Sequence, residues 1–133
     1  MTAEDPGRGV FATGEIDPAA PGFLGVDLAR NGAGAVVCRP VGDLDLNSLA
    51  PVRAALDRAL ESGARLLVVD LAGVGFCDSS GLNLLLQARI EAEQAGVRMR
   101  LAALTGQVSR VFELTGALDV FSVHSTAEEA ERD

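Results

Sequence analysis

Four consecutive residues, Asp78-Ser79-Ser80-Gly81, place a carboxylate and two hydroxyl groups directly before a stretch with the apolar spacing of a helix. The first backbone N–H groups of a helix have no acceptor within the helix, and Asp or Ser side chains at its start commonly provide one. Because that end is also the positive end of the helix dipole, it tolerates an added anion such as a phosphate. The local chemistry therefore predicts a helix cap and leaves open whether one serine is modified.

Two further patterns carry weaker indications of chemistry. Gly73-Val74-Gly75 stands where a phosphate-binding loop would stand, but the third glycine and the lysine of such loops are missing, so a flexible turn is the better interpretation. His124 is the only histidine, and to act as a catalytic base it would have to meet Ser79 or Ser80 through the fold. No G-x-S-x-G pattern surrounds these serines, and no set of metal ligands surrounds His124. We therefore expect no catalytic residue, no metal site and no cofactor.

The elements that must position the serines begin with a predicted hairpin. Residues 25–28 alternate in polarity, residues 31–34 are typical of a turn, and residues 35–41 form a short run rich in Val. Two strands joined this tightly are expected to pair antiparallel. Pro40 cannot donate a sheet hydrogen bond, so the second strand is expected to carry an irregularity or to end early there.

Helices and strands then alternate to the end of the chain. A helix is expected from a cap at Asn47 or Ser48 to a stop at Gly63, with Pro51 in its first turn and an apolar stripe of Leu49, Val52, Leu56 and Ala59 or Leu60. Residues 65–71 are continuously apolar after a polar start, which predicts a central strand covered on both faces. The remaining predicted elements are a loop at 73–75, an inward return at 76–77, helices at 79–94 and 107–114, strands at 97–103 and 120–123, and an acidic helix capped by Thr126. This alternation predicts an α/β fold, in which one mixed sheet with an N-terminal hairpin and parallel βα units is packed with about four helices.

The composition indicates one globular domain that does not bind nucleic acid. A chain of 133 residues that is 48% hydrophobic can bury one core, and a net charge of −8 argues against a surface that collects phosphate groups. Residues 1–22, rich in Gly, Pro and acidic residues, predict a flexible tail before a domain at 23–133. Cys38 and Cys77 lie in or beside apolar runs and are expected to be reduced. No run is apolar enough to span a membrane and no signal peptide is recognisable, so we expect a cytoplasmic protein.

The residues from Asp70 to Leu82, D-L-A-G-V-G-F-C-D-S-S-G-L, resemble the signature of bacterial anti-sigma factor antagonists of the STAS family. The resemblance extends to residues 42–45 and 112–121, and so covers the chain from about Phe23 to the last helix. In that family the first serine after the aspartate is phosphorylated, so the resemblance transfers the phosphosite to Ser79. The matching neighbours are Asp78, Ser80 and Gly81, and the departures are Asn83, where a small residue is frequent, and Pro40.

The resemblance implies a binding switch without enzyme activity of its own. In the family, the unphosphorylated protein captures an anti-sigma factor that is also a serine kinase, which releases the sigma factor, and a serine phosphatase resets the switch. No direct contact with nucleic acid or membrane is implied. The alternative is a STAS subunit of a transporter or stress-sensing complex that binds a stable partner, and the intact Asp-Ser-Ser-Gly favours the antagonist. A nucleotide-binding protein fits less well, because the loop is poor in glycine and lysine.

We expect the partner to contact the start of the helix at 79–94 and the loop after the second strand. The polar face of that helix comprises Asn83, Gln87, Glu91 and Gln94. Leu84 lies near this face, and its spacing leaves open an exposed anchor or a core residue. Because the ends of parallel neighbours meet at one sheet edge, we expect Asp43 and Asp45 beside Asp78 and Ser79. The expected partner-binding residues are Asp43, Asp45, Asp78, Ser80, Gly81, Asn83, Leu84 and Gln87.

Overall fold

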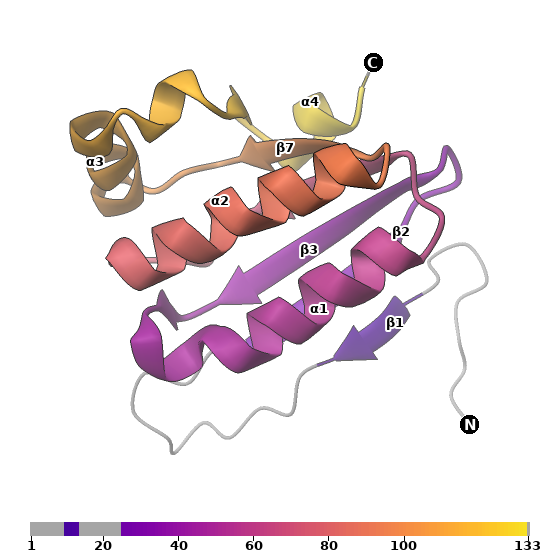
Figure 1. Ribbon diagram of the computed structural model, residues 1–133, viewed down its shortest axis with the longest axis horizontal. Helices are drawn as coiled ribbons and strands as arrows, with labels where there is room; N and C mark the ends of the chain where they lie inside the picture. Colours follow the sequence, from indigo (N-terminus) through magenta and orange to yellow (C-terminus); the bar gives the residue numbers. More distant parts are fainter. Residues whose placement is uncertain (1–9, 14–24, 133) are drawn as a thin grey trace.

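A six-stranded mixed sheet forms the centre of the protein, whose computed structural model describes residues 10–13 and 25–132 (Figure 1). The sheet begins with three antiparallel strands and continues with parallel ones. In spatial order the strands are β1 (Val10–Thr13), β2 (Gly25–Arg30), β3 (Ala35–Val41), β5 (Leu66–Asp70), β7 (Arg98–Ala102) and β8 (Ser122–His124). The prediction of a hairpin followed by parallel βα units is confirmed.

Helices pack on both faces of this sheet. α1 (Leu49–Glu61) and α2 (Ser79–Gln94) lie side by side on one face, and α4 (Ala127–Glu131) packs against β5 and β7 on the other (Figure 1). α3 (Gly106–Thr115) lies at the end of the molecule where α1 and α2 begin (Figure 1). Two short 3-10 helices, η1 (Leu46–Ser48) and η2 (Ala117–Asp119), complete the described elements. α2 has the bounds predicted from the sequence, and α1 and α3 lie within two residues of theirs.

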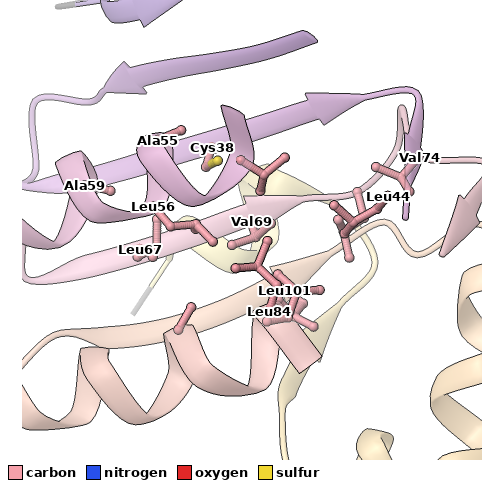
Figure 2. Close-up of a cluster of buried hydrophobic side chains, with 14 of the residues drawn as sticks. Cys38, Leu44, Ala55, Leu56, Ala59, Leu67, Val69, Val74, Leu84 and Leu101 are labelled. Atoms are coloured by element: carbon pink, nitrogen blue, oxygen red, sulfur yellow. The ribbon is translucent and has the colours of Figure 1, made fainter. Parts of the chain in front are cut away.

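Strand β5 explains why its sequence is apolar without alternation. Leu67 and Val69 face the main core under α1 and α2, whereas Leu66 and Val68 face the smaller core under α4. All four side chains are fully buried, with 0% exposure. Figure 2 shows Leu67 and Val69 within the main core, beside Leu56 of α1. A strand covered on both faces was the sequence-based prediction, and it is confirmed.

Pro40 does not interrupt its strand. The register between β2 and β3 runs without a shift from Arg30↔Val36 to Gly25↔Val41 and includes Pro40 opposite Val26. The pairing of β3 with β5 ends earlier, at Cys38↔Val69. The expectation of an irregularity or an early end was wrong on the β2 side, because the ladder on the other side of β3 has already ended before Pro40.

Two other segments differ from the sequence-based expectations. The last strand, expected at 120–123, is β8 at Ser122–His124, because η2 follows Gly116 and delays the start of the strand. Gly116 makes this possible with a left-handed φ of 81°. Within the expected tail at 1–22, Val10–Thr13 forms β1 and pairs with the outer edge of β2, which would otherwise present unpaired backbone groups. The rest of that segment lies outside the described residues.

Candidate functional site at the start of helix α2

A second, two-stranded sheet joins the two segments that were expected to share one face. β4 (Asp43–Leu44) pairs in parallel with β6 (Phe76–Cys77), with Asp43 opposite Phe76 and Leu44 opposite Cys77. The Asp78 amide continues this pairing by donating to the Leu44 carbonyl at 3.3 Å. The loop after β3 and the loop before α2 are therefore held against each other by backbone hydrogen bonds.

Asp78 caps helix α2. Its Oδ1 accepts hydrogen bonds from the backbone N–H of Ser80 at 2.9 Å and of Gly81 at 3.0 Å. Capping by this segment was predicted, and the structure assigns it to the aspartate. Two of the amides that could bind an anion at this helix end are thus already occupied by a carboxylate.

Gly81 allows the first turn of α2 to approach β4 closely. A Cβ atom built on Gly81 would lie 2.4 Å from the Leu44 carbonyl oxygen, 2.8 Å from Leu44 Cγ and 3.0 Å from Cys77 Sγ. Gly73 has a similar role, since its Cβ would lie 3.0 Å from Val41 Cγ2 and 3.1 Å from the Pro40 carbonyl oxygen. The turn at 73–75 was expected to need a flexible backbone, but Gly73 has no left-handed φ, and a side chain there would instead be crowded by Val41 and Pro40.

The two serines differ in exposure. Ser79 is exposed as the first residue of α2, whereas Ser80 is half-buried. Asp43, Asp45 and Asp78 are also half-buried and come from the segments that meet here. This end of the molecule therefore presents one exposed hydroxyl among carboxylates.

Asp45 has a local structural partner. It caps η1, because its side chain accepts from the Asn47 amide at 3.0 Å while its own amide donates to Ser48 Oγ at 3.1 Å. Ser48 Oγ also donates to the Asp43 carbonyl at 2.6 Å. Ser48 stands at the N-cap of α1, as predicted, but its side chain makes no capping bond there, and the side-chain cap at this point is that of Asp45 on η1.

The expected polar face of α2 is only partly available. Asn83, Gln87 and Gln94 are exposed. Glu91 instead binds Arg53 of α1, whose Nη2 lies 2.6 and 2.8 Å from the two carboxylate oxygens. This hydrogen bond is the main reason why the pKa of Arg53 is raised.

Leu84 is a core residue. Its exposure is 5%, and Figure 2 shows it pointing from α2 toward Leu101 of β7. Of the two alternatives that its spacing left open, burial is the one observed. Leu84 is therefore not available as an exposed anchor in this structure.

Three exposed apolar side chains, which were not predicted to belong to the site, lie in or next to these segments. Leu46 in η1 is 71% exposed, Val41 at the end of β3 is 57% exposed and Phe76 in β6 is 41% exposed. Residues 76–77 were expected to turn inward together, but neighbouring residues of a strand face opposite ways, so only Cys77 is buried. Isolated apolar residues carry no periodic signal that would have revealed their exposure.

The two thiols are free and buried. Burial first, and the nearby Asp78 carboxylate second, raise the pKa of Cys77 to about 11. Burial and the Asp27 carboxylate raise the pKa of Cys38 to about 12. The prediction that both cysteines are reduced is confirmed, and both thiols stay protonated at neutral pH.

His124 does not contact the serines of α2. Its Nε2 lies 3.1 Å from Ser122 Oγ on the same strand, and its Nδ1 lies 3.8 Å from a Glu129 carboxylate oxygen on α4. His124 also lines a cavity of about 400 Å³ with Ser109 and Ser125, among other residues. In the described ranges, no group of three His, Cys, Asp or Glu side chains could hold a metal ion, and no helix has the length and apolar character of a membrane span.

Comparisons of this sequence with known proteins give matches that cover most of the chain. The family model described as the STAS domain matches residues 28–130. An anti-sigma F factor antagonist of Lysinibacillus sphaericus is 31% identical over 96 residues, which cover 71% of this chain and 81% of the relative. The relative's match spans most of both chains, so it includes the segments around Ser79.

Solved structures support the same relationship. An anti-sigma factor antagonist from Mycobacterium paratuberculosis has a TM-score of 0.76 at 22% identity, with 84% of this chain and 93% of that chain covered. The antagonist SpoIIAA in its unphosphorylated form gives 0.66 at 30% identity, covering 79% and 91%. Bacillus SpoIIAA in the phosphorylated form gives 0.62 at 27% identity, covering 79% and 95%. The murine anion transporter Slc26a9 gives 0.66 at 21% identity and shares only the fold, over 77% of this chain and 18% of the transporter.

Proposed function

This chain belongs to the STAS domain family, and we propose that it is a cytoplasmic anti-sigma factor antagonist controlled by phosphorylation of Ser79. The unphosphorylated form binds an anti-sigma factor that is also a serine kinase, and this binding releases a sigma factor. Transfer of phosphate to Ser79 abolishes the binding, and a serine phosphatase restores it. The protein itself acts by binding and has no enzyme activity.

The observation that carries this proposal is the exposure of Ser79 at the capped start of α2. A kinase must reach the hydroxyl oxygen from solvent, and Ser79 is exposed whereas the adjacent Ser80 is half-buried. Asp78 holds the backbone at this point through its bonds to Ser80 and Gly81. The kinase is thus offered a hydroxyl on a rigid backbone. The name of the relative and the phosphorylated form of SpoIIAA support an antagonist that is controlled by phosphorylation.

The fold should accept the phosphate. A phosphoserine adds about −1.5 to −2 charges, and a helix N-terminus stabilises an anion by roughly 0.3–1 kcal/mol at an exposed position. The Asp78 carboxylate already occupies two amides of this turn and opposes the phosphate. The two effects have opposite signs, and both are small because they act through solvent at an exposed side chain. We expect little change in the backbone and in stability on phosphorylation.

The partner should reject the phosphate. The exposed apolar side chains of Val41, Leu46 and Phe76 can be buried against a partner, and contact residues on α2 include Asn83 and Gln87. A dianion buried in such a contact loses hydration, and it adds to the negative charge of the aspartates at this end of the molecule. Each 1.4 kcal/mol of this cost lowers the affinity about tenfold. A local change of charge at Ser79 is therefore sufficient to switch binding.

The test is to incubate the protein with its cognate anti-sigma kinase and ATP and to locate the phosphate by mass spectrometry. Wild type and Ser80→Ala should carry phosphate on Ser79, and Ser79→Ala should carry none. In calorimetry, Ser79→Ala should bind the anti-sigma factor as wild type does, and phosphorylated wild type should bind at least tenfold more weakly. Label that persists in Ser79→Ala but disappears in Ser80→Ala would move the site by one residue.

The same measurement tests the second candidate function. The shared fold of the transporter Slc26a9 favours a STAS subunit that binds a stable partner within a larger assembly. Such a subunit would show no phosphorylation by an anti-sigma kinase and no affinity for one. Absence of both in the wild-type protein would refute the antagonist and favour the subunit.

A further inference from the structure

Helix α3 begins against the strand that leads to Ser79. Thr105, directly before α3, donates from Oγ1 to the Val74 carbonyl at 2.7 Å. Gln107 in the first turn accepts from the Cys77 amide at 2.9 Å through Oε1, and its Nε2 lies 3.5 Å from the Cys77 carbonyl. These contacts join residues about thirty positions apart in the sequence.

The Gln107 carboxamide takes the place of a neighbouring strand. β6 is only two residues long and pairs with β4 along one edge. Along its other edge, the carboxamide offers an acceptor to the Cys77 N–H and a donor to the Cys77 carbonyl, as a peptide group would. The next two residues are Asp78, which caps α2, and Ser79. Both edges of β6 are thus held directly before the cap.

We propose that Gln107 is a positioning residue for the serine segment: its carboxamide holds β6 and so sets the place at which Asp78 and Ser79 are presented to the partner. The side chain is half-buried and neutral, and only a carboxamide of this length supplies both a donor and an acceptor. Without it, the Cys77 amide loses its acceptor, and β6 is held by β4 alone. The start of α2 then gains freedom while the main core is left in place.

The kinase assay that tests this inference rests on the proposed function, whereas the hydrogen-exchange measurement does not. Gln107→Met keeps the length of the side chain and removes both hydrogen bonds, and Gln107→Glu keeps an acceptor for the Cys77 amide while removing the donor. The matched control is Gln94→Met, at the exposed end of α2 far along the helix from Ser79. If replacing glutamine by methionine acted only through a general loss of stability, the Gln107→Met and Gln94→Met variants should behave alike.

In Gln107→Met, exchange of the Cys77 amide should become about five- to tenfold faster, as expected for one lost hydrogen bond, while the slowest amides of β5 keep their wild-type rates. Gln107→Glu should show a smaller increase, and Gln94→Met none. With the anti-sigma kinase, Gln107→Met should lower kcat for Ser79 about five- to tenfold and leave KM within a factor of two, because the hydroxyl is misplaced at the reacting centre.

Unchanged Cys77 exchange in Gln107→Met, or a kcat equal to that of Gln94→Met, would overturn the inference. Equal acceleration of exchange at Cys77 and throughout β5 would also overturn it, since that result indicates a general loss of stability. If Gln107→Met does not fold, Gln107→Glu decides the question through the same two measurements. If wild type is not phosphorylated at all, the proposed function fails, and the exchange rates alone still decide whether Gln107 positions this segment.

Discussion

Replacing Gly81 by alanine tests how closely α2 must approach β4. On helix propensity alone, Gly81→Ala should stabilise the protein by up to about 1 kcal/mol, because alanine restricts the unfolded chain and favours the helix. The new Cβ would, however, lie 2.4 Å from the Leu44 carbonyl oxygen and 3.0 Å from Cys77 Sγ. That carbonyl is a backbone atom held by the β4–β6 pairing and by the Asp78 amide, so it cannot move aside cheaply.

Overpacking of this kind typically costs about 1–3 kcal/mol, and a rigid backbone contact belongs at the upper end, so Gly81→Ala should lose about 2 kcal/mol after the helix gain is subtracted. With an m value of about 1–3 kcal/mol/M, the urea midpoint should fall by roughly 1 M. Gly106→Ala is the matched control, because Gly106 is also in a first helical turn but nothing lies within 4 Å of its Cβ position. That control should be neutral or slightly stabilised. A midpoint for Gly81→Ala at or above wild type would refute the close-approach argument.

Four further predictions concern the core, the two cysteines and the ion pair between helices. Leu84→Ala should cost about 2–5 kcal/mol and lower Tm by roughly 10–20 °C, because the side chain is 5% exposed; an unchanged Tm with weakened partner binding would instead favour an anchor. Cys77, with its pKa raised to about 11 from 9.0, should have about a hundredfold less thiolate at pH 8 than an ordinary cysteine. Cys77 and Cys38 should therefore react with a thiol reagent only after unfolding, and prompt labelling of native protein would contradict this. Since the folded state holds the Cys77 proton more tightly, its contribution to stability is complete below pH 9 and is lost as pH rises toward 11, which alkaline unfolding curves can measure. A double-mutant cycle on Arg53 and Glu91, whose side chains are 33% and 38% exposed, should give a coupling free energy of only about 0.5–1 kcal/mol. This coupling should shrink in 1 M salt. A larger, salt-independent value would show that solvent exposure does not weaken this ion pair.

Three helix starts lie close together around Ser79. η1 is capped by Asp45, α2 is capped by Asp78, and the first turn of α3 contacts the strand between them. The contacts are hydrogen bonds between the side chains of Asp45, Asp78 and Gln107 and backbone amides, which restrict the conformations of these segments. Under the proposed function, a partner would meet a surface whose shape is set in advance, and phosphorylation of Ser79 would change only its charge.

Local sequence patterns determined most of the helices and the central sheet. Residues 79–94 have apolar positions that recur with the helical period between a capping segment and Gly96, and α2 has these bounds. Residues 65–71 are continuously apolar, and β5 is buried on both faces. These patterns are legible because burying one face or two faces of a regular element imposes a repeat on neighbouring residues.

The arrangement around Ser79 was decided by the tertiary structure. Strands of two residues, such as β4 and β6, are too short to show a repeat, so their pairing and the outward direction of Phe76 could not be predicted. The spacing of Leu84 was compatible with burial and with exposure, and only packing against β7 distinguished them.

The segment Asp78-Ser79-Ser80-Gly81 has some features that follow from its own sequence and others that depend on the tertiary structure. Its residue types determined by themselves that a helix begins there and that the end is capped, because a free amide and a nearby carboxylate are neighbours in the chain. The exposure of Ser79, the contact of Gly81 with Leu44 and the hold of Gln107 on Cys77 depend on residues about thirty positions or more away. Such contacts form only when the sheet register brings distant segments together, and no local spacing records that register.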